Sequence, residues 1–110
     1  MNYLINTDIS LFATKGKYGL KEKFVAVGFR NCWLSEITKA ELLFSVANSR
    51  LVEKNKAVID AYLVKFAILP ISNVLPLFAE EKAYLQRKGQ IIADFDLLIG
   101  VTAIYYELVL

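Results

Sequence analysis

Histidine is absent from this 110-residue sequence, and cysteine occurs only once, as Cys32. Without histidine, a serine or cysteine nucleophile has no imidazole base beside it, and a ribonuclease mechanism that depends on paired histidines is excluded. A single cysteine forms no intrachain disulfide and no cysteine-based zinc site. A free thiol also suits a reducing compartment. Any hydrolytic chemistry must therefore rest on carboxylates, lysines or a metal-bound water.

Long apolar runs and a strong net charge are also missing. The longest stretch without a charged side chain covers residues 66–79, and two prolines and two polar residues interrupt it. A membrane-spanning helix needs roughly 20 apolar residues. The first residues have neither the basic start nor the small-residue cleavage site of a signal peptide. We therefore expect a cytoplasmic protein without membrane association. The formal charge of +2 is too small to indicate nucleic-acid binding by itself.

Apolar residues are abundant and fall in short runs separated by amphipathic segments. They make up 56% of the chain, which argues against disorder and suits a single domain over residues 1–110. The short runs predict strands at 3–5, 32–34, 67–69 and 108–110. None of these runs alternates between polar and apolar residues. This favours a parallel sheet covered by helices on both faces, and hence an α/β fold.

The segments between the predicted strands have helical spacing and helix-end signals. Val58, Tyr62 and Phe66 recur at a spacing that predicts the buried face of the fourth helix. The first predicted helix follows a polar cluster at 6–8 that can cap it, the second covers 20–27 up to Gly28, and the third begins at Ser35 or Glu36 and ends before Asn48. The fourth covers 53–66, the fifth runs from a cap at Ser72 or Asn73 to Gly89, and the sixth is opened by Asp94 and Asp96 and runs toward Tyr106.

Acidic and amide side chains follow the predicted strands or open the helices after them. Asn6 and Asp8 follow the first strand, Glu41 lies in the helix after the second, and Asp94 and Asp96 open the last helix. Functional groups gather at the carboxyl ends of strands in such sheets. Clustered carboxylates repel one another, and a hard cation such as Mg²⁺ or Mn²⁺ is the usual reason to assemble them. The alternative is that the aspartates only cap helices.

Three segments resemble the motifs of PIN-domain toxins of the VapC family, which belong to type II toxin–antitoxin systems. Residues 4–9 (LINTDI) resemble the opening motif, in which an aspartate normally precedes the threonine. Residues 35–42 (SEITKAEL) resemble the second motif, in which the glutamate that matches Glu41 is an acidic ligand. Residues 87–89 followed by 94–100 (DFDLLIG) resemble the third, whose aspartate precedes the Leu-Leu-Ile run. The motifs occur in family order over essentially the whole chain.

The resemblance implies a three-layer α/β/α sandwich with a central parallel sheet, in which Asn6, Glu41 and Asp96 hold Mg²⁺ or Mn²⁺. Asp94 is implied as a supporting catalytic residue, and Thr7 and Ser35 are candidates to orient the carboxylates. The implied activity is metal-dependent cleavage of RNA, with transfer RNA a frequent target. The cation would lower the pKa of bound water and neutralise charge on the phosphodiester.

Two departures from the family pattern bear on activity. Asn6 stands where the family has its first metal-binding aspartate, and an amide supplies a neutral oxygen in place of a charged one. Family members also continue beyond the strand at 108–110, so we expect a domain truncated at its C-terminus and lacking the last edge strand. We therefore expect a weakened or inactive nuclease. The alternative is a catalytically dead module that binds antitoxin or RNA without cutting.

Binding partners follow from the same resemblance. It implies a VapB-type antitoxin and a homodimer formed through apolar helical surface. An apolar groove for the antitoxin is expected on the first two helices, and packing in the core is the alternative for the same side chains. The groove candidates are Leu11, Phe12, Tyr18, Leu20 and Phe24. RNA would be held by basic residues near the site, and the alternative for each is a solvated surface residue. The basic candidates are Lys15, Lys17, Lys39, Arg87 and Lys88. Tyr18 and Trp33 are candidates for stacking on bases, but Trp33 lies inside a predicted strand and is expected in the core.

Overall fold

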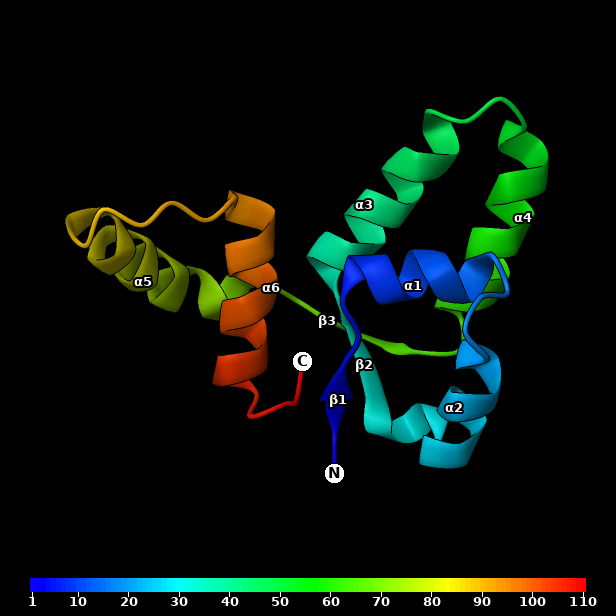
Figure 1. Ribbon diagram of the computed structural model, residues 1–110, viewed down its shortest axis with the longest axis horizontal. Coiled ribbons are helices and arrows are strands. Elements are labelled where there is room, and N and C mark those ends of the chain that lie inside the picture. Colours follow the sequence, from blue (N-terminus) through cyan, green and yellow to red (C-terminus); the bar gives the residue numbers. More distant parts are fainter.

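A sheet of three short parallel strands lies at the centre of the computed structural model, which describes residues 1–110 (Figure 1). The strand order is β1-β2-β3, so that β2 lies between the other two. Tyr3 is in register with Cys32, and Trp33 with Ala67. The strands are β1 (Tyr3–Leu4), β2 (Cys32–Ser35) and β3 (Ala67–Leu69). The parallel sheet predicted from unbroken apolar runs is confirmed.

Four helices separate the first three strands and pack on one side of the sheet. They are α1 (Thr7–Thr14), α2 (Leu20–Val27), α3 (Glu36–Ala47) and α4 (Val52–Leu63), with a short 3₁₀ helix at Phe29–Asn31 before β2. Their apolar faces and β2 form a core of ten buried residues, among them Phe24, Leu34, Leu42 and Tyr62. Gly28 ends α2 with a φ of +95°, a conformation that favours glycine.

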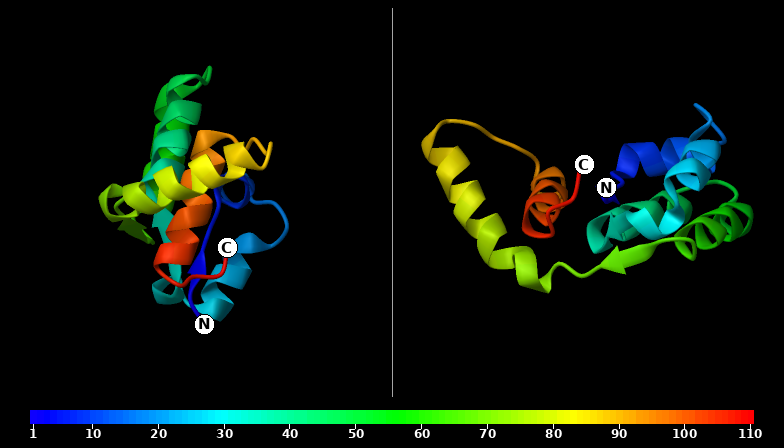
Figure 2. Two further views of the ribbon diagram at one scale, coloured as in Figure 1. Left: turned by 90° about the vertical axis from the view of Figure 1, so that its left-hand side faces the viewer. Right: turned by 90° about the horizontal axis from the view of Figure 1, so that it is seen from below.

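Two further helices cover the opposite side of the sheet. They are α5 (Leu75–Arg87), preceded by a 3₁₀ turn at Ser72–Val74, and α6 (Asp94–Tyr105). Figures 1 and 2 show this pair separated from α1–α4 by the strands. Leu4 and Ile37 pack with Leu98, Ile99 and Ala103 of α6 in a second core. The three-layer α/β/α arrangement is thus confirmed. None of these helices combines the length and apolar character that crossing a bilayer requires.

The side chains of strand β2 pack into the two cores on opposite faces of the sheet. Cys32 and Leu34 belong to the core beneath α1–α4, whereas Trp33 packs against the core beneath α6. Successive side chains of a strand point to opposite faces. Both faces therefore need apolar residues, which is why the strand is apolar throughout.

After α6 the chain returns to the open side of β1. Val109 forms a parallel bridge with Tyr3, and the amide of Leu4 donates to the Val109 carbonyl oxygen at 2.8 Å. The predicted strand at 108–110 is therefore reduced to a single bridge. β2 and β3 follow β1 in one direction, and the C-terminal segment lies on its other side. The order reverses at β1, and crevices at such reversal points are where open α/β sheets bind ligands.

Two local predictions need correction. Tyr62 and Phe66 are buried as predicted, but Val58 is exposed and Ile59 takes its place on the buried face of α4; the helix ends at Leu63, three residues before Phe66. The expected cap at Ser72 or Asn73 is also absent, because these residues form the 3₁₀ turn and α5 begins at Leu75 without a side-chain cap. Pro76 does lie in the first turn of α5, where it removes no helical hydrogen bond.

Candidate active site

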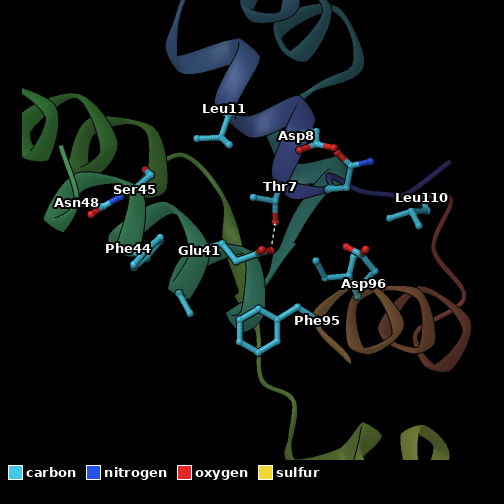
Figure 3. A pocket seen from close by; sticks show the side chains of 13 residues that line it. Thr7, Asp8, Leu11, Glu41, Phe44, Ser45, Asn48, Phe95, Asp96 and Leu110 are labelled. Carbon is cyan, nitrogen blue, oxygen red and sulfur yellow. Dashed lines mark hydrogen bonds between the residues drawn. The ribbon is translucent and has the colours of Figure 1, made fainter. Parts of the chain in front are cut away.

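A cavity of about 1050 Å³ opens at the carboxyl end of β1, between α1, α3 and α6 (Figure 3). One part of its wall bears oxygen atoms and the other is largely apolar. The oxygen-bearing side chains are Asn6, Thr7, Asp8, Glu41, Ser45, Asn48 and Asp96, and the apolar ones are Leu11, Ala40, Phe44, Phe95, Ile99 and Leu110. Asn6, Glu41 and Asp96, which are far apart in the sequence, thus line the same cavity.

Asn6 is positioned by the turn that links β1 to α1. Its backbone is extended, and its Oδ1 accepts a hydrogen bond from the Ile9 amide at 2.9 Å. Asn6 is therefore the N-cap of α1, which confirms that the polar cluster at 6–8 caps this helix. An amide oxygen has two acceptor lone pairs, so the cap leaves one of them for another partner.

Glu41 is held in place by a pair of threonines. The Thr7 hydroxyl donates to Glu41 Oε1 at 2.6 Å, as Figure 3 shows, and lies 3.1 Å from the Thr38 hydroxyl. Thr38 is fully buried and lies one turn before Glu41 on the same face of α3. The prediction that Thr7 orients a carboxylate is confirmed, and Thr38 extends the network beyond it.

Ser35, the other candidate for orienting a carboxylate, has a different partner. Its hydroxyl accepts a hydrogen bond from the Ile37 amide at 3.0 Å, and its side chain is completely buried. Ser35 is thus the N-cap of α3. It acts on the site only by starting the helix that carries Glu41.

Asp94 and Asp96 lie on different sides of the first turn of α6. Asp96 lines the cavity. Asp94 does not; its Oδ1 lies 2.9 Å from Lys82 Nζ of α5 in a partly exposed ion pair. Side chains two positions apart on a helix do not share a face. Neither aspartate caps α6, because the helix has no side-chain cap. The alternative that both aspartates are mere caps is therefore wrong for this helix.

The oxygen atoms of the cavity are of the type that binds a hard cation, but few of them carry a negative charge. Glu41 and Asp96 supply carboxylates and Asn6 an amide oxygen, and such oxygen ligands are those that Mg²⁺ prefers. No three acidic, cysteine or histidine side chains are grouped closely enough to hold a metal ion. Asp8 adds an exposed carboxylate to the same cavity wall. The types of the side chains therefore suit Mg²⁺ or Mn²⁺, whereas the number of grouped carboxylates is low for such an ion.

Comparison with known proteins defines the family. No family model matches the chain. Ribonuclease VapC2 of Rickettsia felis is 30% identical over 108 residues, which cover 94% of this chain and 80% of that protein. This chain belongs to the VapC family. The tRNA(fMet)-specific endonuclease VapC of Shigella flexneri is 26% identical over 102 residues, 91% of this chain and 76% of the other.

A solved VapC-family structure has the same fold. The chain superposes on one in the VapBC2 complex from Rickettsia felis, bound to a DNA fragment from its promoter, with a TM-score of 0.89 and 29% identity. The match covers 98% of this chain and 84% of that one. The PIN-domain fold expected from the three motifs is confirmed for this VapC-family chain.

The basic residues considered for RNA binding lie outside the VapC-family cavity. None of them lines it, and all five are exposed. Lys17 Nζ lies 5.9 Å from the centre of the Phe12 ring, and Lys88 Nζ lies 5.5 Å from that of Tyr84. Trp33 is half-buried against the α6 core, as expected of a core residue, whereas Tyr18 is exposed. None of the five basic candidates therefore contributes to the cavity wall.

The first two helices offer less apolar surface than expected. Leu20 and Phe24 are buried in the core, so their predicted place in a groove for a partner is wrong. Phe12 packs against the same core, and Leu11 lines the cavity. Tyr18 alone of the five groove candidates is exposed, with its ring edge against Phe12.

The titratable groups with clearly shifted pKa values lie elsewhere. Burial raises the pKa of Tyr62 to about 12, and its hydroxyl donates to Ser10 Oγ at 2.9 Å. Burial also raises the pKa of the Cys32 thiol, which keeps it protonated and unreactive. Both side chains belong to the core beneath α1–α4. Neither side chain lines the cavity, so these shifts concern the core and not the candidate site.

Proposed function

We propose that this VapC-family chain is the toxin of a VapBC-type module and that its cavity cleaves RNA with the help of Mg²⁺ or Mn²⁺. The observation that carries the proposal is the meeting of Asn6, Glu41 and Asp96 in one cavity at the carboxyl end of β1. The named ribonuclease activity of the relatives supports the reaction class. The tRNA specificity in the name of the Shigella protein makes tRNA the first substrate to test.

Four of the cavity residues have distinct parts in the proposed reaction. Glu41 and Asp96 would hold the cation, with Asn6 as a neutral third ligand. Thr7 fixes one oxygen of Glu41 through its 2.6 Å hydrogen bond and so sets the direction of the other. A divalent cation held there supplies the Lewis acidity that phosphodiester hydrolysis needs. Carboxylates are the only titratable groups in this cavity, so they must also accept the proton of the attacking water.

Asn6 is proposed to lower the RNA-cleaving activity of the chain without lowering the stability of its fold. Asparagine and aspartate are equally good N-caps, so Asn6→Asp keeps the start of α1 while adding the missing charge. We expect the chain as it stands to cleave RNA weakly or not at all. Changes to residues that only support metal ligands typically cost about 10–100-fold in affinity or activity, and loss of a ligand charge should cost at least as much.

Restoring the carboxylate tests the proposal. Cleavage of total tRNA is measured with Mn²⁺ for the unchanged chain and for Asn6→Asp, with and without EDTA. Asn73→Asp, which adds the same charge at an exposed residue outside the cavity, is the control. The proposal expects EDTA-sensitive cutting to rise at least 10-fold in Asn6→Asp alone. Equal cutting by all three proteins would contradict it.

A second candidate is a binding module that does not cut. The neutral Asn6 and the lack of three grouped acidic residues favour it. In that case Asn6→Asp would bind Mn²⁺ no better than the unchanged chain and would remain inactive on every RNA. Binding of an antitoxin would be retained, because it does not require the cation.

We further propose a VapB-type antitoxin partner, action in the cytoplasm and a homodimer. The partner is supported by the VapBC complex of the structural neighbour. Exposed apolar side chains of α6, Ile104 and Tyr105, are candidates for the contact between two copies. Sedimentation of the purified chain tests the dimer, and Ile104→Asp should convert it to a monomer if this surface is used.

A further inference from the structure

Two exposed phenylalanines share the cavity with the carboxylates. Phe44 has 67% of its surface exposed and Phe95 has 49%, and they are the only phenylalanines among the exposed large hydrophobic residues. Phe44 lies one turn after Glu41 on α3, and Phe95 directly precedes Asp96 on α6. In Figure 3 the Phe95 ring projects from α6 toward α3, while Phe44 lies beyond Glu41 along α3. Each carboxylate thus has an aromatic neighbour.

The composition of the cavity indicates what would cover these rings. No lysine or arginine lines it, so charge attraction to phosphates inside it must come from a bound cation. Aromatic faces bind unpaired bases by stacking, whatever the base. Asn48 and Ser45 lie on the same wall as Phe44, and the Asn48 amide can both donate to and accept from the edge of a base.

An apolar protein segment fits the cavity less well. Filling it with such a segment would remove Glu41 and Asp96 from water without giving them a cationic partner, which is costly for charged groups. A nucleotide avoids this cost, because its phosphate shares the cation with the carboxylates while its base lies on a ring. Oxygen ligands beside aromatic faces therefore favour single-stranded RNA as the occupant.

We propose that Phe44 and Phe95 stack on unpaired bases next to the phosphodiester and so position the RNA strand against the carboxylates. This inference rests on the proposed function, since it takes the cavity to be the place of cleavage. Bases in a duplex are stacked on one another and cannot lie against the rings. The two phenylalanines are thus the residues of this chain that bind the bases next to the cleaved bond.

Fluorescence of 2-aminopurine tests the stacking without relying on cleavage. A ten-nucleotide unpaired RNA carrying 2-aminopurine is titrated with the unchanged chain in Ca²⁺, which takes the same oxygen ligands as Mg²⁺. The fluorescence should be quenched on binding. Loss of one stacked base corresponds to about 5- to 150-fold weaker binding, so Phe44→Ala and Phe95→Ala should each weaken binding by a factor in this range and reduce the quenching. Phe44→Trp and Phe95→Trp should retain both.

Controls separate this inference from the proposed function. Tyr84→Ala, an aromatic residue on α5 outside the cavity that is as exposed as Phe95, should leave quenching unchanged. A duplex carrying the same label should not be quenched. If Asn6→Asp cuts RNA while neither alanine variant changes quenching, the stacking inference is contradicted and the proposed nuclease activity is retained. If quenching depends on the phenylalanines but no variant cuts RNA, the proposed nuclease activity is contradicted while the stacking inference is retained. A change of sedimentation in Phe44→Ala with unchanged quenching would assign the ring to a protein interface and overturn the inference.

Discussion

Replacing Thr7 by valine removes one hydroxyl from the cavity and changes little else in shape. The hydroxyl donates to Glu41 Oε1 at 2.6 Å and lies 3.1 Å from the Thr38 hydroxyl. Valine leaves the Glu41 carboxylate without its donor and places a methyl group against a fully buried hydroxyl. Two consequences follow, one for stability and one for the proposed cation.

The size of the stability change follows from these two contacts. A hydrogen bond to a charged group contributes about 1.5–3 kcal/mol, and a buried hydroxyl left without a partner costs about 1–3 kcal/mol. Thr7 and Glu41 are only half-buried, so the lower end of the first range applies. We expect Thr7→Val to lower the free energy of unfolding by about 2.5 kcal/mol, the sum of the two lower ends. Thr7→Ser keeps the hydroxyl and should cost about 1 kcal/mol or less, the value of one methyl group.

Urea unfolding and a metal titration measure the two effects. Unfolding compares Thr7→Val with Thr7→Ser, and a double-mutant cycle with Glu41→Gln isolates their coupling. Mn²⁺ affinity, measured in the Asn6→Asp background, should fall about 10–100-fold in Thr7→Val because Glu41 is no longer oriented. Identical Mn²⁺ affinities for Thr7→Val and Thr7→Ser would show that this hydrogen bond does not prepare the ligand.

Three further outcomes are expected. Asn6→Ala removes the N-cap of α1 and should lower the free energy of unfolding by about 1 kcal/mol, whereas Asn6→Asp should not, as urea unfolding will show. Asp94→Asn should leave Mn²⁺ affinity in the Asn6→Asp background unchanged within about 2-fold, since Asp94 lies outside the cavity; a larger loss would place it among the ligands. Folding raises the pKa of Tyr62 from its usual value near 10 to about 12, so the folded state holds this proton more tightly. Its contribution to stability is complete below about pH 10 and is lost between pH 10 and 12, and Tyr62→Phe should remove that part of the pH dependence of unfolding.

Much of the fold follows from local chemistry that a sequence displays. Asn6 and Ser35 are good N-cap residues directly after apolar runs, and both cap helices in the structure. Gly28 ends its helix because a positive φ is easy for glycine. Local chemistry did not predict which side chains of α4 face the core. Val58 and Ile59 are adjacent and both apolar, so periodicity alone does not decide which one faces the core.

The candidate site was predictable in its residues but not in its contacts. Asn6, Glu41 and Asp96 follow from motif order, and the cavity contains all three. The separation of Asp94 from Asp96 could have been predicted, because residues two apart on a helix point in different directions. The contact between Thr7 and Thr38 could not, since it depends on how α1 packs against α3. Likewise, the place of Leu110 in the cavity wall depends on the return of the chain beside β1.

A crystal structure of the Asn6→Asp variant soaked with Mn²⁺ is the most direct test of the proposed cation site. Anomalous scattering locates the ion without assumptions about its ligands. We expect one peak within roughly 2.0–2.3 Å of side-chain oxygens at residue 6, Glu41 and Asp96. An ion bound elsewhere, or a cavity in which Glu41 and Asp96 do not share a cation, would contradict the nuclease mechanism proposed for this chain.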